Sequence, residues 1–273
     1  MAGAPGVVTG LTFLPHEALA GVRWGRGGMP ALAVAACSRI APDIAFVPSW
    51  EPWAAEALDR IVACGTQVVW AVRGPFGEVA GRDGWTPTIK RSLTVPEGLR
   101  EDLEARLPHA LESVRRGASL GALAIVVAED LAGADGPLLA PDYVFEELVP
   151  LLARIADAAA ESALPTVLHS DGDTRALLHA VRHAGYAGLH AGGLDEARFE
   201  RLFDAARAEG LCVLGGIPTS VLGEGPLVAS GAGTRAALLA RRGGLLVTDD
   251  GGITRPEELA ALVSALAAAR ESA

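Results

Sequence analysis

The stretch PTVLHSDGDTRALLHAVRHAGYAGLH, residues 165–190, decides the fold. It contains two short apolar runs, 166–169 and 187–190, and neither alternates regularly with polar residues. Between the runs, Asp173 can cap a helix that Gly185 can end. Because strands buried on both faces lack polar alternation, the stretch predicts a strand, a helix and a second, parallel strand.

The same pattern recurs along the whole chain. The other expected strands are Val7–Phe13, Asp43–Val47, Gln67–Val72, Leu123–Ala128, Leu211–Leu214 and Leu245–Thr248. Helices are expected at 51–63, 142–162 and 194–209, the second with a kink or a break at Pro150, and a capping box of Thr254 and Glu257 precedes a further helix. Eight strands alternating with helices predict an α/β fold, a single (β/α)8 TIM barrel over residues 1–273. An open doubly wound sheet is the alternative.

The composition narrows the class of function. With 33 acidic and 23 basic residues the formal net charge is -10, which argues against a nucleic-acid partner. Lys90 is the only lysine, so Schiff-base catalysis would depend on it. Cys37, Cys64 and Cys212 lie far apart, which argues against a disulfide framework or a cysteine-rich zinc site.

The sequence also gives an expectation for localisation. The N-terminal apolar stretch follows no basic residue, and no apolar run approaches the roughly 20 residues of a membrane span. We therefore expect a cytoplasmic protein with no membrane partner, and a homodimer is the oligomer that we consider.

Polar side chains follow most of the predicted strands. In a barrel, the carboxyl ends of the strands and the loops after them meet at one mouth and build the active site. The residues concerned are Ser49, Trp50, Glu51, Arg73, Glu129, Asp130, His169, Ser170, Asp171, His190, Asp249 and Asp250. A solvated loop or a helix cap could account for any one of these residues, but the convergence of so many at one mouth favours a functional site.

His169 is the most informative of these residues. It ends a predicted strand, and Asp171 follows two residues later. A histidine with a nearby carboxylate can bind a metal or act as an oriented acid–base group. His190 ends the next strand and offers a second imidazole, although a histidine packed at the barrel rim is an equal alternative.

Two glycine doublets follow the last two predicted strands. Gly215-Gly216 and Gly251-Gly252 each precede an isoleucine and a turn. Backbone amides in such turns can hold a phosphate, and barrels often bind phosphate at this position. Tight turns without a ligand are the alternative.

Several of these motifs together resemble one family. Glu129-Asp130-Leu131-Ala132, the element at 136–141, Pro150 and the segment 168–173 resemble the uroporphyrinogen decarboxylase superfamily. Segments 74–77 and 252–258 also fit. The resemblance implies a (β/α)8 barrel and one of two activities. One branch decarboxylates uroporphyrinogen without a cofactor, and the other contains corrinoid-dependent methyltransferases.

The methyltransferase branch implies a metal site. Its His-x-Cys-Gly element, which supplies zinc ligands, aligns with His169 and Asp171, and its further cysteine falls near Asp250. Both cysteines are replaced here, so Asp171 with Asp249 or Asp250 would form a site richer in oxygen, with a weaker preference for zinc.

The leading expectation is therefore a methyltransferase-like protein that uses a divalent metal, zinc in the family, and a corrinoid carried by a partner protein. The expected metal ligands are His169, Asp171, Asp249 and Asp250. His169, Asp130, Glu51 and His190 are expected to serve as catalytic acid–base groups, and Arg73, Trp50, Gly216 and Gly251 to bind the small-molecule substrate. The alternatives are a metal-free decarboxylase acting on a porphyrinogen or smaller polycarboxylate, a phosphate-binding barrel, and a non-catalytic paralogue.

Overall fold

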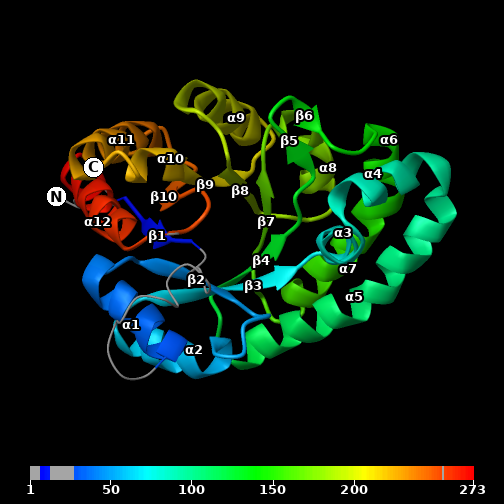
Figure 1. The fold of residues 1–273 in the computed structure, drawn as a ribbon, viewed down its shortest axis with the longest axis horizontal. Coiled ribbons are helices and arrows are strands. Elements are labelled where there is room, and N and C mark those ends of the chain that lie inside the picture. Colours follow the sequence, from blue (N-terminus) through cyan, green and yellow to red (C-terminus); the bar gives the residue numbers. More distant parts are fainter. Residues whose placement is uncertain (1–6, 13–27, 254) are drawn as a thin grey trace.

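The structure is a computed structural model, which describes residues 7–12, 28–253 and 255–273. Parallel strands close into a barrel, with the last strand paired to the first (Figure 1). Around the barrel the order is β1 (Thr9–Leu11), β2 (Ile44–Pro48), β3 (Gln67–Arg73), β4 (Ala124–Ala128), β7 (Thr166–Asp171), β8 (Gly188–Gly192), β9 (Cys212–Ile217) and β10 (Leu245–Asp249). The predicted (β/α)8 barrel is confirmed, and the open sheet is excluded. Phe13, the predicted end of the first strand, lies outside the described residues.

Helices surround the barrel in the described part of the chain (Figure 1). They are α1 (Gly28–Ile40), α2 (Ala54–Ala63), α3 (Pro75–Asp83), α4 (Trp85–Thr94), α5 (Pro96–Ser119), α6 (Pro141–Tyr143), α7 (Val149–Ala160), α8 (Leu178–His183), α9 (Glu196–Ala208), α10 (Thr219–Leu222), α11 (Pro226–Ala240) and α12 (Pro256–Glu271). A small antiparallel pair, β5 (Ala132–Gly133) and β6 (Gly136–Pro137), follows β4. Among the described residues, no helix has both the length and the apolarity needed to cross a bilayer.

Both faces of the barrel strands are buried, which explains their lack of polar alternation. On β2, Ile44 and Phe46 belong to a small apolar cluster with residues of β3, β4, β7 and β9, as expected for the barrel interior. Ala45 and Val47 belong to a larger cluster that includes apolar side chains of the surrounding helices. The large core therefore lies between barrel and helices.

Two helix predictions differ from the structure in detail. The helix expected over 142–162 is interrupted by a π-helical turn, Val144–Leu148, and Pro150 lies in the first turn of α7. The Val149 N–H donates to the Val144 carbonyl, so the π-helical turn leads directly into α7, and the change from π to α geometry falls at Pro150, which has no N–H to donate. The predicted capping box lies one residue later, where the Arg255 backbone N–H donates to Glu258. Thr254 lies outside the described residues.

Candidate functional site

The acidic pair after β4 lies beside the end of β7. Ala128 pairs with His169 in the barrel register, so the residues after Ala128 run along the end of β7. The Asp171 backbone N–H donates to Asp130 Oδ1 at 2.9 Å, which fixes the Asp130 loop to the strand. β7 extends two residues beyond the predicted strand, so Asp171 belongs to the strand itself.

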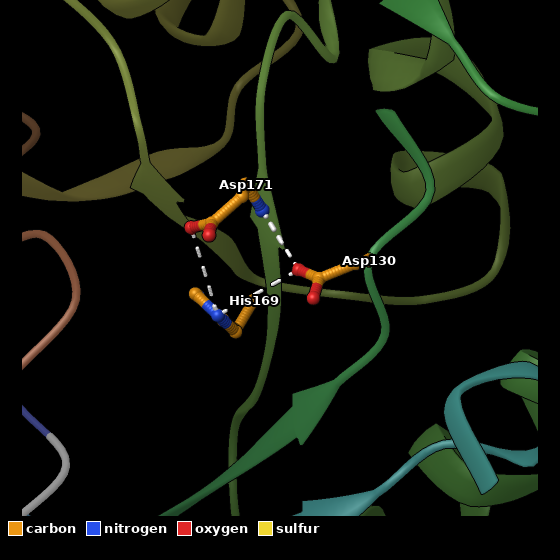
Figure 2. Close-up of side chains that lie close together, drawn as sticks. All are labelled: Asp130, His169 and Asp171. Atoms are coloured by element: carbon orange, nitrogen blue, oxygen red, sulfur yellow. Dashed lines mark hydrogen bonds and ion pairs between the residues drawn. The ribbon is translucent and has the colours of Figure 1, made fainter. Parts of the chain in front are cut away.

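Asp130, His169 and Asp171 form a candidate metal-binding group. His169 Nε2 lies 3.8 Å from Asp130 Oδ1 and 3.9 Å from Asp171 Oδ1 (Figure 2). One possible ligand atom from each residue lies within 4.8 Å of the others. The sequence predicted His169 and Asp171 as ligands and Asp130 as an acid–base group, and the structure brings all three together.

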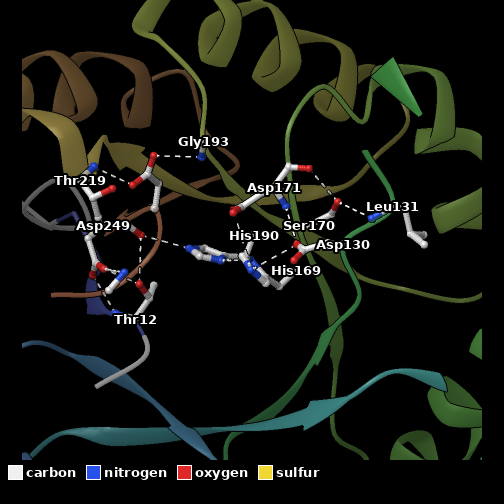
Figure 3. A network of polar contacts seen from close by, with 12 residues as sticks. Thr12, Asp130, Leu131, His169, Ser170, Asp171, His190, Gly193, Thr219 and Asp249 are labelled. Carbon is white, nitrogen blue, oxygen red and sulfur yellow. Dashed lines mark hydrogen bonds and ion pairs between the residues drawn. The ribbon is translucent and has the colours of Figure 1, made fainter. Parts of the chain in front are cut away.

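A second histidine fixes the orientation of His169. Nδ1 of His169 lies 2.7 Å from Nδ1 of His190, and Nε2 of His190 lies 3.0 Å from the carbonyl oxygen of Asp249 (Figure 3). A carbonyl oxygen only accepts, so Nε2 of His190 carries a hydrogen. His190 is fully buried, and burial followed by the influence of His169 lowers its pKa to about 3. A neutral His190 therefore accepts at Nδ1 from the Nδ1–H of His169.

This hydrogen-bond chain determines what His169 offers to the site. When the hydrogen of His169 is on Nδ1, the Nε2 lone pair points toward Asp130 and Asp171. An imidazole nitrogen and two carboxylates that converge in this way can share a proton or a cation. One imidazole nitrogen and two carboxylates are suitable ligands for a divalent metal, with less preference for zinc than a thiolate set. The donor set thus fits the predicted metal.

Asp249 lies at the end of β10 and is fully buried. Its Oδ1 accepts from the Thr12 backbone N–H at 2.7 Å and its Oδ2 from the Gly252 N–H at 2.7 Å. The Thr12 hydroxyl also donates to Oδ2 (Figure 3). Burial raises the pKa of Asp249 to about 6, against these hydrogen bonds. The carboxylate thus joins the end of β1 to the loop after β10.

Asp250 has a similar structural environment. Its Oδ1 accepts from the Thr219 N–H at 2.6 Å and its Oδ2 from the Gly193 N–H at 3.2 Å, and burial raises its pKa. The geometry thus joins Asp130, instead of Asp249 or Asp250, to His169 and Asp171. A ligand role for Asp249 or Asp250 stays a prediction.

Glu129 holds the loop after β3, a role that the sequence analysis missed. It is fully buried, and its carboxylate accepts from the N–H groups of Phe76 at 2.9 Å and Gly77 at 2.6 Å, in the first turn of α3. A Cβ atom on Gly74 would collide with this carboxyl group. The signal of this contact in the sequence was the segment 74–77, which the family resemblance above includes.

A cavity of about 250 Å³, the mouth pocket, opens beside the metal-binding group. Its lining comprises Trp50, Arg73, Gly77, Trp85, Ala128, Asp130 and His169. The Arg73 guanidinium lies over the Trp50 ring, 4.9 Å from its centroid. These two predicted substrate-binding residues thus lie together beside His169. Trp85, on α4, packs edge-on against Phe76 and was not predicted from the sequence.

Other predicted site residues lie elsewhere. Glu51, on the loop after β2, accepts from the Trp53 indole N–H, and the fully buried His190 lies behind His169. Gly216 lines a larger cavity of about 500 Å³ between α9 and α11, and Gly251 lies near Thr219. The acid–base roles of Glu51 and His190 and the substrate roles of the two glycines stay predictions.

No family model and no curated protein matches the sequence. Solved structures that resemble it include a methyltransferase from Methanosarcina mazei, with a TM-score of 0.71, 15% identity, and coverage of 98% of this chain and 94% of that one. A B12-independent methionine synthase from Shewanella sp. W3-18-1 has a TM-score of 0.65, 11% identity and coverage of 98% and 97%.

The resemblance extends to proteins of a different activity. A D-allulose 3-epimerase from Methylomonas sp. has a TM-score of 0.58, 14% identity and coverage of 100% of both chains. At these identities the comparisons show a shared barrel fold, and function has to be argued from the site. Membership of the uroporphyrinogen decarboxylase superfamily stays a prediction.

Proposed function

We propose that this protein is a metal-assisted methyltransferase that moves a methyl group from a corrinoid on a partner protein to a small acceptor. The observation that carries the proposal is the convergence of His169, Asp130 and Asp171, two of which line the mouth pocket. The fold shared with the Methanosarcina methyltransferase supports it, and the corrinoid and the partner follow from the superfamily resemblance.

The residues of the mouth would have two roles, to orient the ligands of a bound cation and to balance its charge. His169, held by His190, would present Nε2 to a divalent cation, and Asp130 and Asp171 would supply the balancing negative charge. Such a cation acts as a Lewis acid that lowers the pKa of a coordinated thiol. Arg73 would bind an anionic group of the acceptor.

The transfer balances without a further reactant. A thiol acceptor would gain the methyl group on sulfur and release its proton to solvent. The corrinoid donor would supply the methyl group and keep the electron pair of the broken carbon–cobalt bond. Trp50 and Trp85 would place apolar walls beside this reaction.

The test uses free methylcobalamin and a small thiol with zinc-loaded protein. We expect accelerated loss of the methyl–cobalt absorbance and formation of the thioether, detected by mass spectrometry. His169→Ala should return the rate to that of the protein-free reaction, whereas His179→Ala, which alters an exposed histidine on α8, should keep it. Acceleration that survives His169→Ala would overturn the proposal, as would no acceleration by protein with stoichiometric metal.

A further inference from the structure

A second, smaller cavity of about 140 Å³ adjoins the mouth pocket, and we call it the side cavity. Trp50 and Arg73 line both spaces, so the Arg73 guanidinium and the indole beneath it lie at their boundary. The remaining walls come from the loop after β2, from α3 and from α5, including Ser49, Ser113 and Arg116. The side cavity therefore extends the mouth pocket away from His169.

The carboxylates around the side cavity already have partners. Glu78 lies 2.6 Å from Nδ1 of His109, and Glu112 lies 3.8 Å from Arg115. Neither Arg73 nor Arg116 forms an ion pair with any carboxylate that the structure describes. The side cavity is thus lined by two guanidinium groups without a carboxylate partner among the described residues, whereas its two lining carboxylates, Glu78 and Glu112, have partners of their own.

The hydroxyl groups of the side cavity add donors at fixed positions. The Ser113 hydroxyl donates to Ser49 Oγ at 2.8 Å, so the hydrogen of Ser49 is directed to another acceptor. The Trp70 indole N–H donates to the Ser113 carbonyl at 3.1 Å, and the Ser49 N–H donates to Ala71, which hold the two serines in place. Guanidinium and hydroxyl donors together recognise oxyanions.

We propose that the side cavity binds an oxyanion group, such as a carboxylate, sulfonate or phosphate, at the far end of the substrate whose reacting end lies at His169. The inference rests on the proposed function for the position of the reacting end. A volume of about 140 Å³ holds one such group and is too small for a second substrate. Arg116 then determines specificity, and Arg73 contacts the substrate from the boundary.

The test measures binding by calorimetry, which needs no turnover. The ligands are methylthio-carboxylates of increasing chain length, each compared with the alcohol that replaces its carboxylate. Arg116→Gln is compared with Arg100→Gln, on the same helix, which pairs with Glu147 and does not line the side cavity. Arg116 is exposed, and an unchanged thermal melt would show that the variant folds.

We expect the wild type to prefer the acid to the alcohol at the chain length that spans both cavities. Arg116→Gln should weaken acid binding about tenfold, leaving alcohol binding unchanged, because hydrogen bonds to charged groups are among the stronger ones. Arg100→Gln should change neither. Equal binding of acid and alcohol, binding of neither, or equal effects of the two variants would overturn the inference.

The outcome is separable from that of the proposed function. If Arg116→Gln abolishes a preference for acids in a protein that shows no methyl transfer, the result supports the oxyanion site and contradicts the proposed methyltransferase. If His169→Ala abolishes methyl transfer in a protein that shows no preference for acids, the result supports the methyltransferase and contradicts the oxyanion site.

Discussion

Two sets of carboxylates lie at the same edge of the barrel and differ in what surrounds them. The first set, Glu129, Asp249 and Asp250, is at most 5% exposed, and each carboxylate accepts from at least two backbone N–H groups. In the second set, the side chains of Asp130 and Asp171 are 37% and 55% exposed and lie beside His169. The carboxylates of the first set hold neighbouring loops in place, and those of the second set are accessible to a ligand. Backbone donors, more than residue type, distinguish the two.

The largest effect is expected from Glu129, in the first set. Burial raises its pKa from 4.5 to about 8, so the folded state holds the proton more tightly than the unfolded chain does. The stability that this group contributes is present below the unfolded pKa and is lost as the pH rises through about 8. Between about pH 5 and pH 9 the free energy of unfolding should fall by up to about 4 kcal/mol relative to Glu129→Gln. Parallel urea-unfolding curves for both proteins at every pH would contradict this.

Removing the Asp249 carboxylate should cost nearly as much. Asp249→Ala leaves the Thr12 N–H, the Thr12 hydroxyl and the Gly252 N–H without their acceptor in a fully buried site. We expect a loss of about 3 kcal/mol in the free energy of unfolding, measured in urea. If the variant does not fold, Asp249→Asn, which keeps one acceptor oxygen, should fold with a smaller loss. A loss under about 1 kcal/mol would place Asp249 in the second set.

His190 should affect metal binding through His169. His190→Phe removes the acceptor of the His169 Nδ1–H, and changes behind a metal ligand typically weaken affinity by about 10- to 100-fold. Competition with a chromophoric chelator measures this, and His190→Gln, whose amide oxygen can accept, should recover part of the loss. His179→Phe is the control, because its side chain is 74% exposed on α8. Equal metal affinities for His190→Phe and the wild type would show that His190 has no role in metal binding.

The smallest effect on stability is expected in the second set. Asp171→Asn should change the free energy of unfolding by less than about 1 kcal/mol, because the side chain is 55% exposed. Urea unfolding of metal-free protein measures it. A loss as large as that of Asp249→Ala would remove the distinction between the two sets.

The fold could be predicted because its signal is local. Each strand is a short apolar run, most of them followed by polar residues, and a strand buried on both faces leaves this pattern in the sequence whatever its neighbours are. The position of His169 at the end of a strand, with Asp171 two residues later, could be found for the same reason. The end of β7 could not be predicted in the same way, since polar residues such as Asp171 continue the strand.

The ligand set could not be predicted in full because it depends on contacts between distant segments. Asp130 and Asp250 both follow strands and are alike in sequence, and they differ in which backbone N–H groups face them. Trp85 and Arg116 come from helices between β3 and β4, where no strand end marks them. Only the packing of α4 and α5 brings them to the cavities at the mouth.

The proposed function depends on a divalent cation held by His169, Asp130 and Asp171, and titration of chelator-treated protein with the metal measures whether it binds. We expect one tightly bound ion per chain for the wild type, lost in His169→Ala and in Asp171→Asn. Asp250→Asn should keep the ion, since backbone N–H groups of Thr219 and Gly193 occupy its carboxylate. A wild type that binds no stoichiometric ion, or a His169→Ala variant that binds it as tightly, would contradict the proposed metal site.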